Sequence, residues 1–417
     1  MTSHSVISTE HSSTTERPPS ADSCRSRHVL HVVRSLEVGG LERLVADMVR
    51  VRGTETTSVA CFCTAGAFAE PLKQAGARVL TYSGRNSRFG RMSWLAKIIR
   101  TLRPDIVNCH NIYAFLYAGL VAWWCRHRGL VVTKHGQTIP DTPLVRWLFP
   151  LLLRRAAVVC VSQDIRDSME SRFPASAGNL RYIRNGIDMS AYGAASDRAA
   201  IRTSLGFDRD SVVLGSIGRL TVEKGYDILL TAFANVDARG RKLRLVIAGD
   251  GPCRDELTQQ ISRLGLSDRV KLLGERHDVP ELLSGFDAFV LASRSEGQPL
   301  SVIEAMASGL PIIATTAGGI PSLVRHGVCG VLVSPNDSAA LQATLTDFID
   351  RPDEFRAFGR VAEQTAKSAF GVSQMLADYE QVYEHTLDSA QSRSSAGEPC
   401  GFTVTPPTSL KSDTLQG

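Results

Sequence analysis

The sequence of 417 residues lacks any apolar run that approaches the roughly 20 residues of a membrane-spanning helix. It also lacks a strong charge bias, because a net charge of +5 is mild for a dedicated nucleic-acid-binding protein. Its nine cysteines form no CxxC pair and no metal-ligand spacing, which argues against a structural zinc site. We therefore expect free thiols in a reducing compartment, the cytoplasm, and a protein that does not span a membrane.

Apolar residues are also scarce at the two ends of the chain. Residues 1–27 are rich in Ser and Thr and have no apolar core, so they do not have the pattern of a signal peptide. Residues 389–417 are polar again. We predict a disordered tail at each end, because neither segment has enough apolar surface to bury.

The region between these tails contains twelve short, β-branched apolar runs that longer amphipathic segments separate. The runs lie at 28–33, 57–63, 77–82, 105–110, 130–135, 157–162, 211–218, 243–251, 270–274, 287–293, 310–316 and 330–335. Runs without polar alternation are typical of parallel strands that helices cover on both faces. Two successive sets of six predict an α/β fold with two tandem, doubly wound Rossmann-like domains.

The boundary between these domains falls in a stretch rich in Gly, Ala and Ser. We place the N-terminal domain at residues 28–195 and the C-terminal domain at 196–370. A last helix at 371–388 is expected to return to the N-terminal domain. Because open parallel sheets bind ligands at the carboxyl ends of their strands, we expect the domains to face each other across a cleft that holds the site.

The stretch SRSEGQPLSVIEAMASGLP at 293–311 places one carboxylate, Glu296, before a predicted helix and another, Glu304, inside it. Pro299 suits the first helical position, and Gly297 lets the backbone approach a ligand closely. A helix start suits a phosphate, and carboxylates accept hydrogen bonds from vicinal hydroxyls. The stretch therefore fits two sugar rings joined by a diphosphate. The alternative is that Glu304 only complements the helix dipole and that Glu296 is a solvated charge.

Two cations, Arg219 and Lys224, follow the first strand of the C-terminal domain. A guanidinium fork and a mobile ammonium together suit a diphosphate. One Arg and one Lys in a loop are more often solvated charges, but both stand at the end of the strand where a ligand is expected.

Other candidates follow strands at the same edge. Gly39 and Gly40 precede a helix of the N-terminal domain, and Gly249 turns the chain after a strand of the C-terminal domain. His135 and His110 each end a strand. Any one of these residues alone is more often structural than functional, and their shared position makes ligand contacts plausible.

Taken in order, six motifs resemble those of the family-4 retaining glycosyltransferases of the GT-B fold. They are Gly39–Gly40, His135, NGID at 185–188, GRL and EKG within 218–225, AGDGP at 248–252, and EGQPLSVIEAMASGLP at 296–311. The resemblance covers Val29 to Leu387, nearly all of the chain between the tails. One departure is the run Gly297, Gln298 and Pro299, since many relatives have an aromatic residue and a glycine after the first glutamate. Another is Asn108, where relatives often have a second histidine.

The resemblance implies a role for each of these residues. Arg219 and Lys224 would bind the donor diphosphate, and Glu304 the nucleotide ribose. Glu296 would hold the donor sugar, and His135 would contact that sugar near the reacting centre. The remaining residues implied in binding the nucleotide-sugar are Gly39, Gly40, Gly249, Gly297, Gln298, Pro299 and Leu300. The loop 274–279 would lie by the nucleobase.

The implied activity is retaining transfer of a hexosyl unit from a nucleotide-diphospho-sugar, with a UDP-sugar favoured. The acceptor would be a glycan or a lipid-linked molecule in envelope or extracellular polysaccharide synthesis. We expect no cofactor and no metal, because preorganised cations would stabilise the leaving diphosphate. Two alternatives stay open: a GT-B sugar-nucleotide epimerase and a non-catalytic sugar-nucleotide-binding protein. Nucleic acid is not an expected partner.

Three segments of the N-terminal domain, 91–103, 123–128 and 144–155, mix large apolar side chains with basic ones. The first places four apolar residues on one helical face: Leu95, Ile98, Ile99 and Leu102. Basic amphipathic surfaces bind anionic lipid headgroups, so the inner face of the cytoplasmic membrane is a candidate peripheral partner. The alternative is that each apolar face packs on its own sheet and that the cations are solvated.

Overall fold

The computed structural model describes residues 27–85, 87–136, 138–193 and 197–395. The described strands form two sheets, a seven-stranded sheet in the order β3-β2-β1-β4-β5-β6-β7 and a six-stranded sheet in the order β10-β9-β8-β11-β12-β13. The strand pairs in both sheets are parallel. In each sheet the strand order reverses once, beside β1 and beside β8, as in doubly wound folds. The predicted pair of Rossmann-like domains is confirmed.

All twelve predicted apolar runs contain a strand. The strands are β1 (Val29–Val33), β2 (Thr57–Cys61), β3 (Arg78–Thr81), β4 (Ile106–Cys109), β5 (Leu130–Lys134), β6 (Ala157–Cys160), β7 (Leu180–Tyr182), β8 (Val212–Ile217), β9 (Leu243–Ala248), β10 (Val270–Leu272), β11 (Ala288–Leu291), β12 (Ile312–Thr315) and β13 (Gly330–Val333). The apolar pattern did not predict the edge strand β7, because Arg181 and Arg184 interrupt its sequence.

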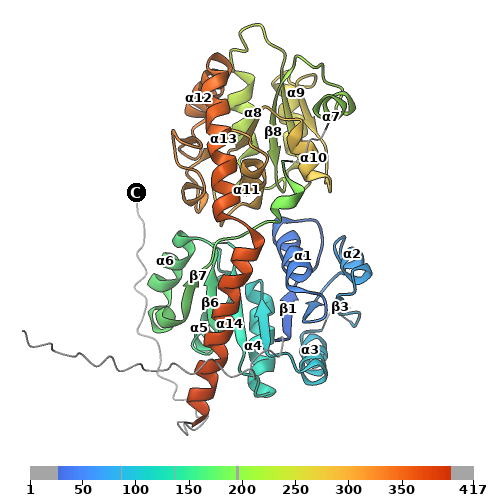
Figure 1. Ribbon diagram of the computed structural model, residues 1–417, viewed down its shortest axis with the longest axis vertical. Helices are drawn as coiled ribbons and strands as arrows, with labels where there is room; N and C mark the ends of the chain where they lie inside the picture. The colour runs from blue at the N-terminus through green and yellow to red at the C-terminus, as the bar shows by residue number, and fades with distance from the viewer. Residues whose placement is uncertain (1–26, 86, 137, 194–196, 396–417) are drawn as a thin grey trace, which may run out of the picture.

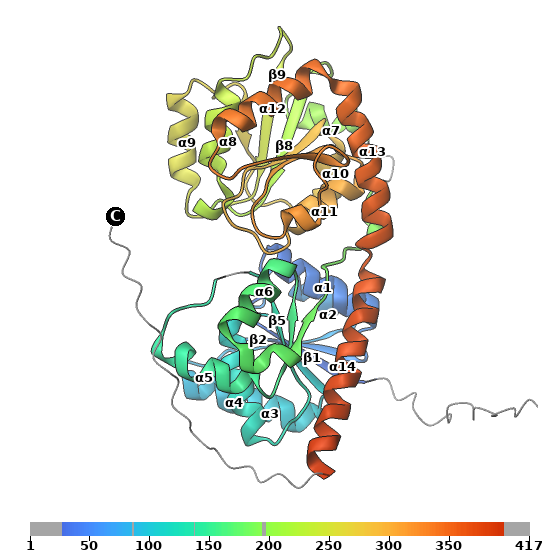
Figure 2. The same cartoon turned by 90° about the vertical axis from the view of Figure 1, so that its left-hand side faces the viewer.

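Helices cover both faces of each sheet, as Figures 1 and 2 show. In the N-terminal domain they are α1 (Gly40–Arg52), α2 (Ala69–Gln74), α3 (Arg88–Leu102), α4 (Ile112–Trp124), α5 (Pro143–Leu153) and α6 (Gln163–Arg172). Four of them begin at a Ser, Asn or Thr whose side chain accepts a backbone N–H three residues later: Ser87, Asn111, Thr142 and Ser162. Local capping therefore places these helix starts.

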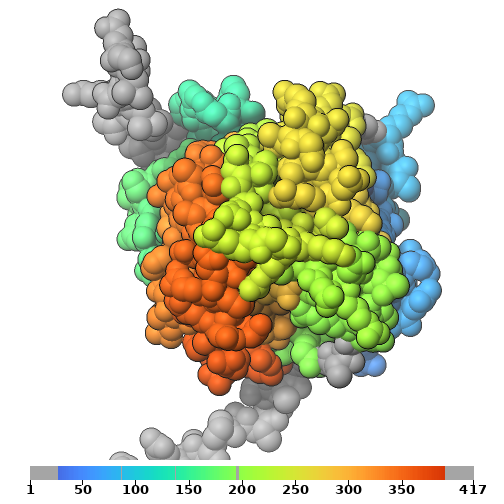
Figure 3. Space-filling view, turned by 90° about the horizontal axis from the view of Figure 1, so that it is seen from above, coloured from blue at the N-terminus to red at the C-terminus, as the bar shows by residue number. Residues whose placement is uncertain are grey.

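The remaining helices follow the domain boundary. They are α7 (Arg198–Ser204), α8 (Tyr226–Ala234), α9 (Arg254–Arg263), α10 (Val279–Ser284), α11 (Leu300–Ala307), α12 (Ser338–Asp350), α13 (Pro352–Ala369) and α14 (Val372–Ser395). Short 3₁₀ turns lie at Pro174–Asn179, Met189–Ala191, Val222–Lys224 and Ile320–Ser322. Figure 3 views the outer end of the C-terminal domain, where α9 lies on the opposite side from α12 and α13.

Helix α14 leaves the C-terminal domain and packs on α1 and β5 of the N-terminal domain (Figures 1 and 2). The hydroxyl of Tyr383 accepts a hydrogen bond from Asn108 Nδ2 at 3.0 Å, and the Tyr379 hydroxyl lies 3.2 Å from Thr133 Oγ1. These four polar groups are buried and paired, so they fix the helix on the sheet. The helix continues to Ser395, so the prediction of a disordered tail from residue 389 is wrong for residues 389–395.

Two chain crossings join the domains. The N–H of Ile187 donates to the carbonyl of Phe370, and the N–H of Val372 donates to the carbonyl of Ile187, both at 2.9 Å. Gly186 packs against Gly371, because a Cβ on Gly186 would lie 2.6 Å from the Gly371 carbonyl oxygen. The two crossings therefore form one paired hinge.

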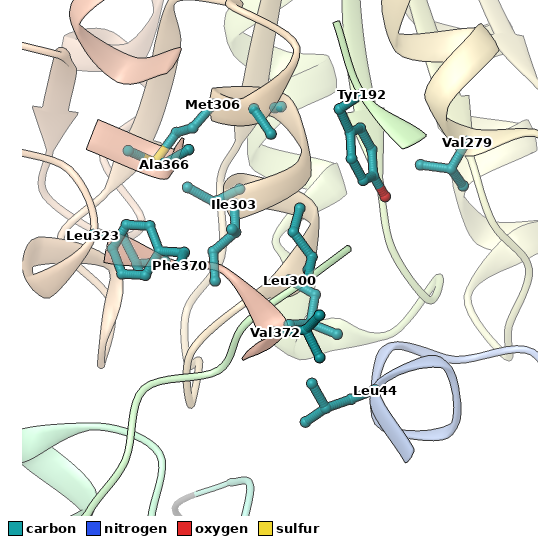
Figure 4. Close-up of a cluster of buried hydrophobic side chains, with 14 of the residues drawn as sticks. Leu44, Tyr192, Val279, Leu300, Ile303, Met306, Leu323, Ala366, Phe370 and Val372 are labelled. Carbon is teal, nitrogen blue, oxygen red and sulfur yellow. The ribbon is translucent and has the colours of Figure 1, made fainter. Parts of the chain in front are cut away.

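The facing ends of the two domains share one apolar cluster. Leu44 of α1 lies beside Leu300 of α11 and Val372 of α14 in Figure 4, and all three belong to the same buried cluster. The domain interface is therefore packed, and α1 lies against the start of α11.

The apolar face of α3 does not face solvent. Leu95, Ile98 and Ile99 are all buried in the core of the N-terminal domain. The interpretation of this face as a membrane-binding surface is therefore wrong, and its alternative, packing on the sheet, holds. None of the described helices combines the length and the apolar composition needed to cross a membrane.

Candidate functional site

Loops at the carboxyl ends of strands from both sheets meet at the domain interface. A Cβ on Gly40 would lie 3.7 Å from Leu300 Cδ1, and a Cβ on Gly39 would lie 3.9 Å from Arg219 Nη2. The glycine pair of the N-terminal domain thus touches two predicted site residues of the C-terminal domain. The position predicted for the site, between the strand ends of the two sheets, is where these residues lie.

A second contact joins Gly297 to His135. A Cβ on Gly297 would lie 2.0 Å from the carbonyl oxygen of His135, so a side chain cannot fit at this position without displacing backbone. The carbonyl of Gly297 also accepts the N–H of Gly319 at 2.9 Å. This glycine is therefore required for the close approach of the two domains as well as being a candidate for ligand binding.

Lys224 and Glu296 form an ion pair. Lys224 Nζ lies 2.6 Å from Glu296 Oε1, and Ser293 Oγ donates to the same oxygen at 2.6 Å. The side chain of Glu296 is 9% exposed and that of Lys224 is 20% exposed. The resemblance assigned these residues to the sugar and the diphosphate, and the structure shows that they also hold each other in place.

Arg219 is exposed at the same edge. Its Nη2 atom points toward Gly39. Burial raises the pKa of Glu42, and the nearby positive charge of Arg219 partly offsets that rise. Among the described residues, no ion pair of Arg219 within 4.0 Å is found. Arg219 is thus available to an anion at the domain interface.

Glu304 is buried and has partners from outside its own helix. Its Oε1 atom accepts a hydrogen bond from the Tyr192 hydroxyl at 2.9 Å and lies 3.3 Å from Arg43 Nη1. Arg43 belongs to α1, so this ion pair crosses the domain interface. Burial raises the pKa of Glu304, while Arg43 and Tyr192 lower it.

Gln298 and Pro299 have structural contacts. Gln298 Oε1 accepts the backbone N–H of Asn185, and Asn185 Nδ2 donates to the Gln298 carbonyl at 3.0 Å. The side chain of Gln298 therefore ties the loop to the hinge. Pro299 is the N-cap of α11 and not its first residue, so the helix begins one residue later than predicted. Pro299 supplies no N–H to a ligand.

Gly249 has a positive φ of 139°, and a Cβ there would lie 2.0 Å from the carbonyl oxygen of Gly218. The N–H of Leu220 also donates to the carbonyl of Asp250 at 2.9 Å. These backbone contacts fix the AGDGP turn against the loop that carries Arg219. The role of Gly249 in binding a nucleotide stays a prediction.

Three histidines form a hydrogen-bonded chain that ends at the site. His110 Nδ1 lies 3.1 Å from His135 Nε2, and His110 Nε2 lies 2.8 Å from His31 Nδ1. Burial lowers the pKa of His31 and of His135 to about 3 and that of His110 well below its ordinary value. All three rings are therefore neutral. Lys134 Nζ donates to the Thr138 carbonyl at 2.9 Å, which holds the loop after His135.

Sequence reasoning missed Arg43, Tyr192 and His31 as site residues. Arg43 was detectable in principle, because it lies in the first turn of the helix that follows Gly39–Gly40. His31 is a polar residue in the middle of a buried apolar strand, which is a visible but weak signal. No local pattern points to Tyr192, because its partner is 112 positions away in the sequence.

A hollow of about 310 Å³ lies near the domain boundary and is lined by Arg184, Gly371 and Gln374 among others. None of the predicted site residues lines it. It belongs to the hinge and not to the facing loops.

Comparison with known proteins identifies the family. Residues 38–191 match the family described as Glycosyltransferase Family 4, and residues 197–365 match Glycosyl transferases group 1. The D-inositol 3-phosphate glycosyltransferase of Streptomyces scabiei is 30% identical over 67% of this chain and 67% of its own. The alpha-D-kanosaminyltransferase of Streptomyces kanamyceticus is 31% identical over 54% of this chain, and the match spans 61% of that relative's length.

A solved structure shows the same architecture. The crystal structure of Anabaena HepE in complex with UDP-glucose is 27% identical and superposes with a TM-score of 0.78 over 87% of this chain and 100% of that one. Two parallel-sheet domains whose strand ends face each other define the GT-B glycosyltransferase class. The chain belongs to the family-4 glycosyltransferases, so its activity is sugar transfer.

Proposed function

We propose that the protein is a retaining, metal-independent hexosyltransferase that uses a UDP-sugar as its donor. The observation that carries this proposal is the meeting of Arg219, Lys224, Glu296 and Glu304 at the domain interface. The complex of Anabaena HepE with UDP-glucose supports a UDP-linked donor. The retaining outcome rests on the resemblance to the family.

The two cations would stabilise the departing diphosphate. Arg219 is available to phosphate oxygens, and Lys224 Nζ has three N–H donors, of which Glu296 takes one. Lys224 can therefore contact a phosphate while it stays paired with Glu296. Preorganised positive charge of this kind lowers the barrier for a leaving group on which negative charge develops. It would take the place that a divalent metal has in other transferases, and no cofactor is needed.

Glu304 would bind the ribose and Glu296 the donor sugar. Tyr192 and Arg43 hold Oε1 of Glu304. No partner of Glu304 Oε2 is found in the described part of the chain, which leaves this oxygen for a ribose hydroxyl. Glu296, fixed by Lys224 and Ser293, would accept a hydrogen bond from a sugar hydroxyl beside the backbone of Gly297.

The acceptor would be a glycan or a lipid-linked molecule that binds to the N-terminal domain. The reaction would take place in the cytoplasm and contribute to the synthesis of envelope or extracellular polysaccharide. Phe89, Trp124 and Trp147 are the most exposed aromatic side chains in the described part of this domain, at 83%, 58% and 63%. Arg100 lies 4.9 Å from the Trp124 ring. Exposed aromatic and basic side chains suit the peripheral surface of an anionic membrane, which is the second part of this proposal.

The donor is tested by incubating the protein with UDP- and GDP-sugars, with and without a mixture of candidate acceptors and with EDTA. We expect acceptor-dependent release of UDP that survives EDTA. Isomerisation of the donor without acceptor would show an epimerase instead, and binding without turnover under all conditions would show a sugar-nucleotide-binding protein. Nuclear magnetic resonance of the product's anomeric proton tests retention.

The membrane part has its own test. We expect co-sedimentation with vesicles that contain anionic lipid and loss of binding in the double variant Trp124→Ser, Trp147→Ser. The matched control is Val222→Ser, which changes an exposed apolar residue of the C-terminal domain. Absence of vesicle binding at low salt would contradict membrane association and favour a soluble acceptor.

A further inference from the structure

The three histidines of the N-terminal domain come from three neighbouring strands. His31 lies in the middle of β1, His110 follows β4, and His135 follows β5. These strands are adjacent in the sheet order. The ring centroids lie 5.0 Å apart for His31 and His110 and 5.3 Å apart for His110 and His135, with interplanar angles of 31° and 27°. The rings form one continuous chain from the buried sheet to the predicted donor-sugar site.

Only two proton arrangements satisfy both hydrogen bonds of this chain. Each neutral imidazole has one N–H and one acceptor nitrogen. If His31 donates from Nδ1, then all three rings have their proton on Nδ1. If His31 accepts at Nδ1, all three have it on Nε2. The state of His135 is therefore coupled to that of His31 through His110.

The buried end of the histidine chain, at His31, distinguishes the two proton arrangements. His31 Nε2 is buried and has no hydrogen-bond partner in the structure as described. In the second arrangement this atom would be a buried N–H without an acceptor, the rarer kind of unsatisfied group in folded proteins. The first arrangement leaves only a lone pair at this atom.

We propose that His31 and His110 are positioning residues that hold His135 in the tautomer with its proton on Nδ1. His135 then presents an N–H donor, and not a base, to an oxygen of the donor sugar. Its Nε2 atom is taken by His110, and Nδ1 has no partner among the described residues. The contact with a sugar oxygen rests on the proposed function, whereas the tautomer does not.

The tautomer is measured directly by nitrogen-15 magnetic resonance of the histidine-labelled full chain. His135→Asn and His110→Asn assign the signals by their loss. We expect His135 and His110 in the wild-type protein to be neutral with the proton on Nδ1. A proton on Nε2 of His135, or rapid averaging between the two tautomers, would overturn the proposal. This measurement needs no substrate.

Variants of His31 test whether the buried end controls the site. His31→Asn keeps a side-chain N–H near the position of Nδ1, whereas His31→Leu removes it. We expect His31→Leu to lower kcat about tenfold, the scale of one hydrogen bond, and to give His135 a mixture of tautomers. His31→Asn should stay within about threefold of wild type, and both variants should bind UDP as tightly as wild type.

Equal kcat values for the two His31 variants would contradict control of His135 by the hydrogen-bonded histidines. If His31→Leu does not fold, the wild-type spectrum still decides the tautomer. If the wild-type protein transfers no sugar, the proposed function fails, and the spectrum remains the test of the histidine chain.

Discussion

At the scale of single residues, the charged side chains at the domain interface form ion pairs with one another. Lys224 pairs with Glu296, and Glu304 holds Arg43 across the two domains. Both carboxylates are less than one-tenth exposed, at 9% and 5%. Since buried charges need partners, these pairs hold the two carboxylates in fixed positions at the interface.

The diphosphate clamp gives the first prediction. Arg219→Ala and Lys224→Ala should each lower kcat/KM by roughly 30- to 1,000-fold, which corresponds to about 2–4 kcal/mol of lost transition-state stabilisation. The matched control is Lys242→Ala, because Lys242 is an exposed cation of the same domain that pairs with Asp208. Steady-state kinetics with the UDP-sugar donor measures the effect. Near-normal turnover in either clamp variant would remove that residue from the mechanism.

The buried histidines give a prediction for the pH dependence of stability. The folded pKa of His31 is lowered from 6.5 to about 3, so the unfolded chain binds its proton first as the pH falls. This histidine's contribution to stability is full above pH 6.5 and is lost as the pH falls toward 3, by about 1.4 kcal/mol per pH unit. His110 is shifted in the same direction.

Urea denaturation followed by tryptophan fluorescence measures this loss, since all four tryptophans lie in the N-terminal domain. Between about pH 7.5 and pH 5.5 the wild-type free energy of unfolding should fall, and His31→Asn should lose roughly 1 kcal/mol less. An equal loss in both proteins would show that His31 is not buried as a neutral ring.

At the scale of elements, the sequence predicted what depends on local pattern. Apolar runs located twelve strands. β7 was missed because Arg181 and Arg184 interrupt its sequence, whereas the equally short β10 lies in an apolar run that continues into Leu273. The end of α14 was placed seven residues early because its last turns are polar. The ion pairs of Glu304 and Lys224 and the histidine chain were not predictable in this way. Lys224 and Glu296 are 72 positions apart, His31 and His110 are 79 apart, and His110 and His135 are 25 apart on separate strands. These contacts depend on how the sheets and domains meet.

The paired hinge gives a prediction at this scale. In Gly186→Ala the new methyl group would overlap the backbone of Gly371, whereas Gly371→Ala would meet nothing within 4 Å. We expect Gly186→Ala to destabilise the protein by about 1–3 kcal/mol and to lower its melting temperature. Gly371→Ala should have little effect on either. Scanning calorimetry compares the two, and similar melting temperatures would argue against close packing at the hinge.

At the scale of the whole molecule, the proposed donor site is built from residues of both domains. The C-terminal domain contributes Arg219, Lys224 and both glutamates, while α1 and the strand ends of the N-terminal domain contribute Arg43 and His135. Helix α14 returns to the N-terminal domain and couples the two (Figure 2). The six motifs were sufficient to predict the fold and the family. They did not show which charged groups pair across the domain interface.

Calorimetric titration of UDP and of UDP-glucose into wild type, Glu304→Gln and Glu296→Gln tests the central claim, that the domain interface is a nucleotide-sugar site. Glu304→Gln should weaken UDP and UDP-glucose alike, by roughly 10- to 100-fold for a hydrogen bond to a charged group. Glu296→Gln should bind UDP within about threefold of wild type and lose only the added affinity of the glucose unit. If the wild-type protein binds neither molecule, or if both variants lose UDP affinity equally, the assignment of the two glutamates to ribose and sugar is contradicted.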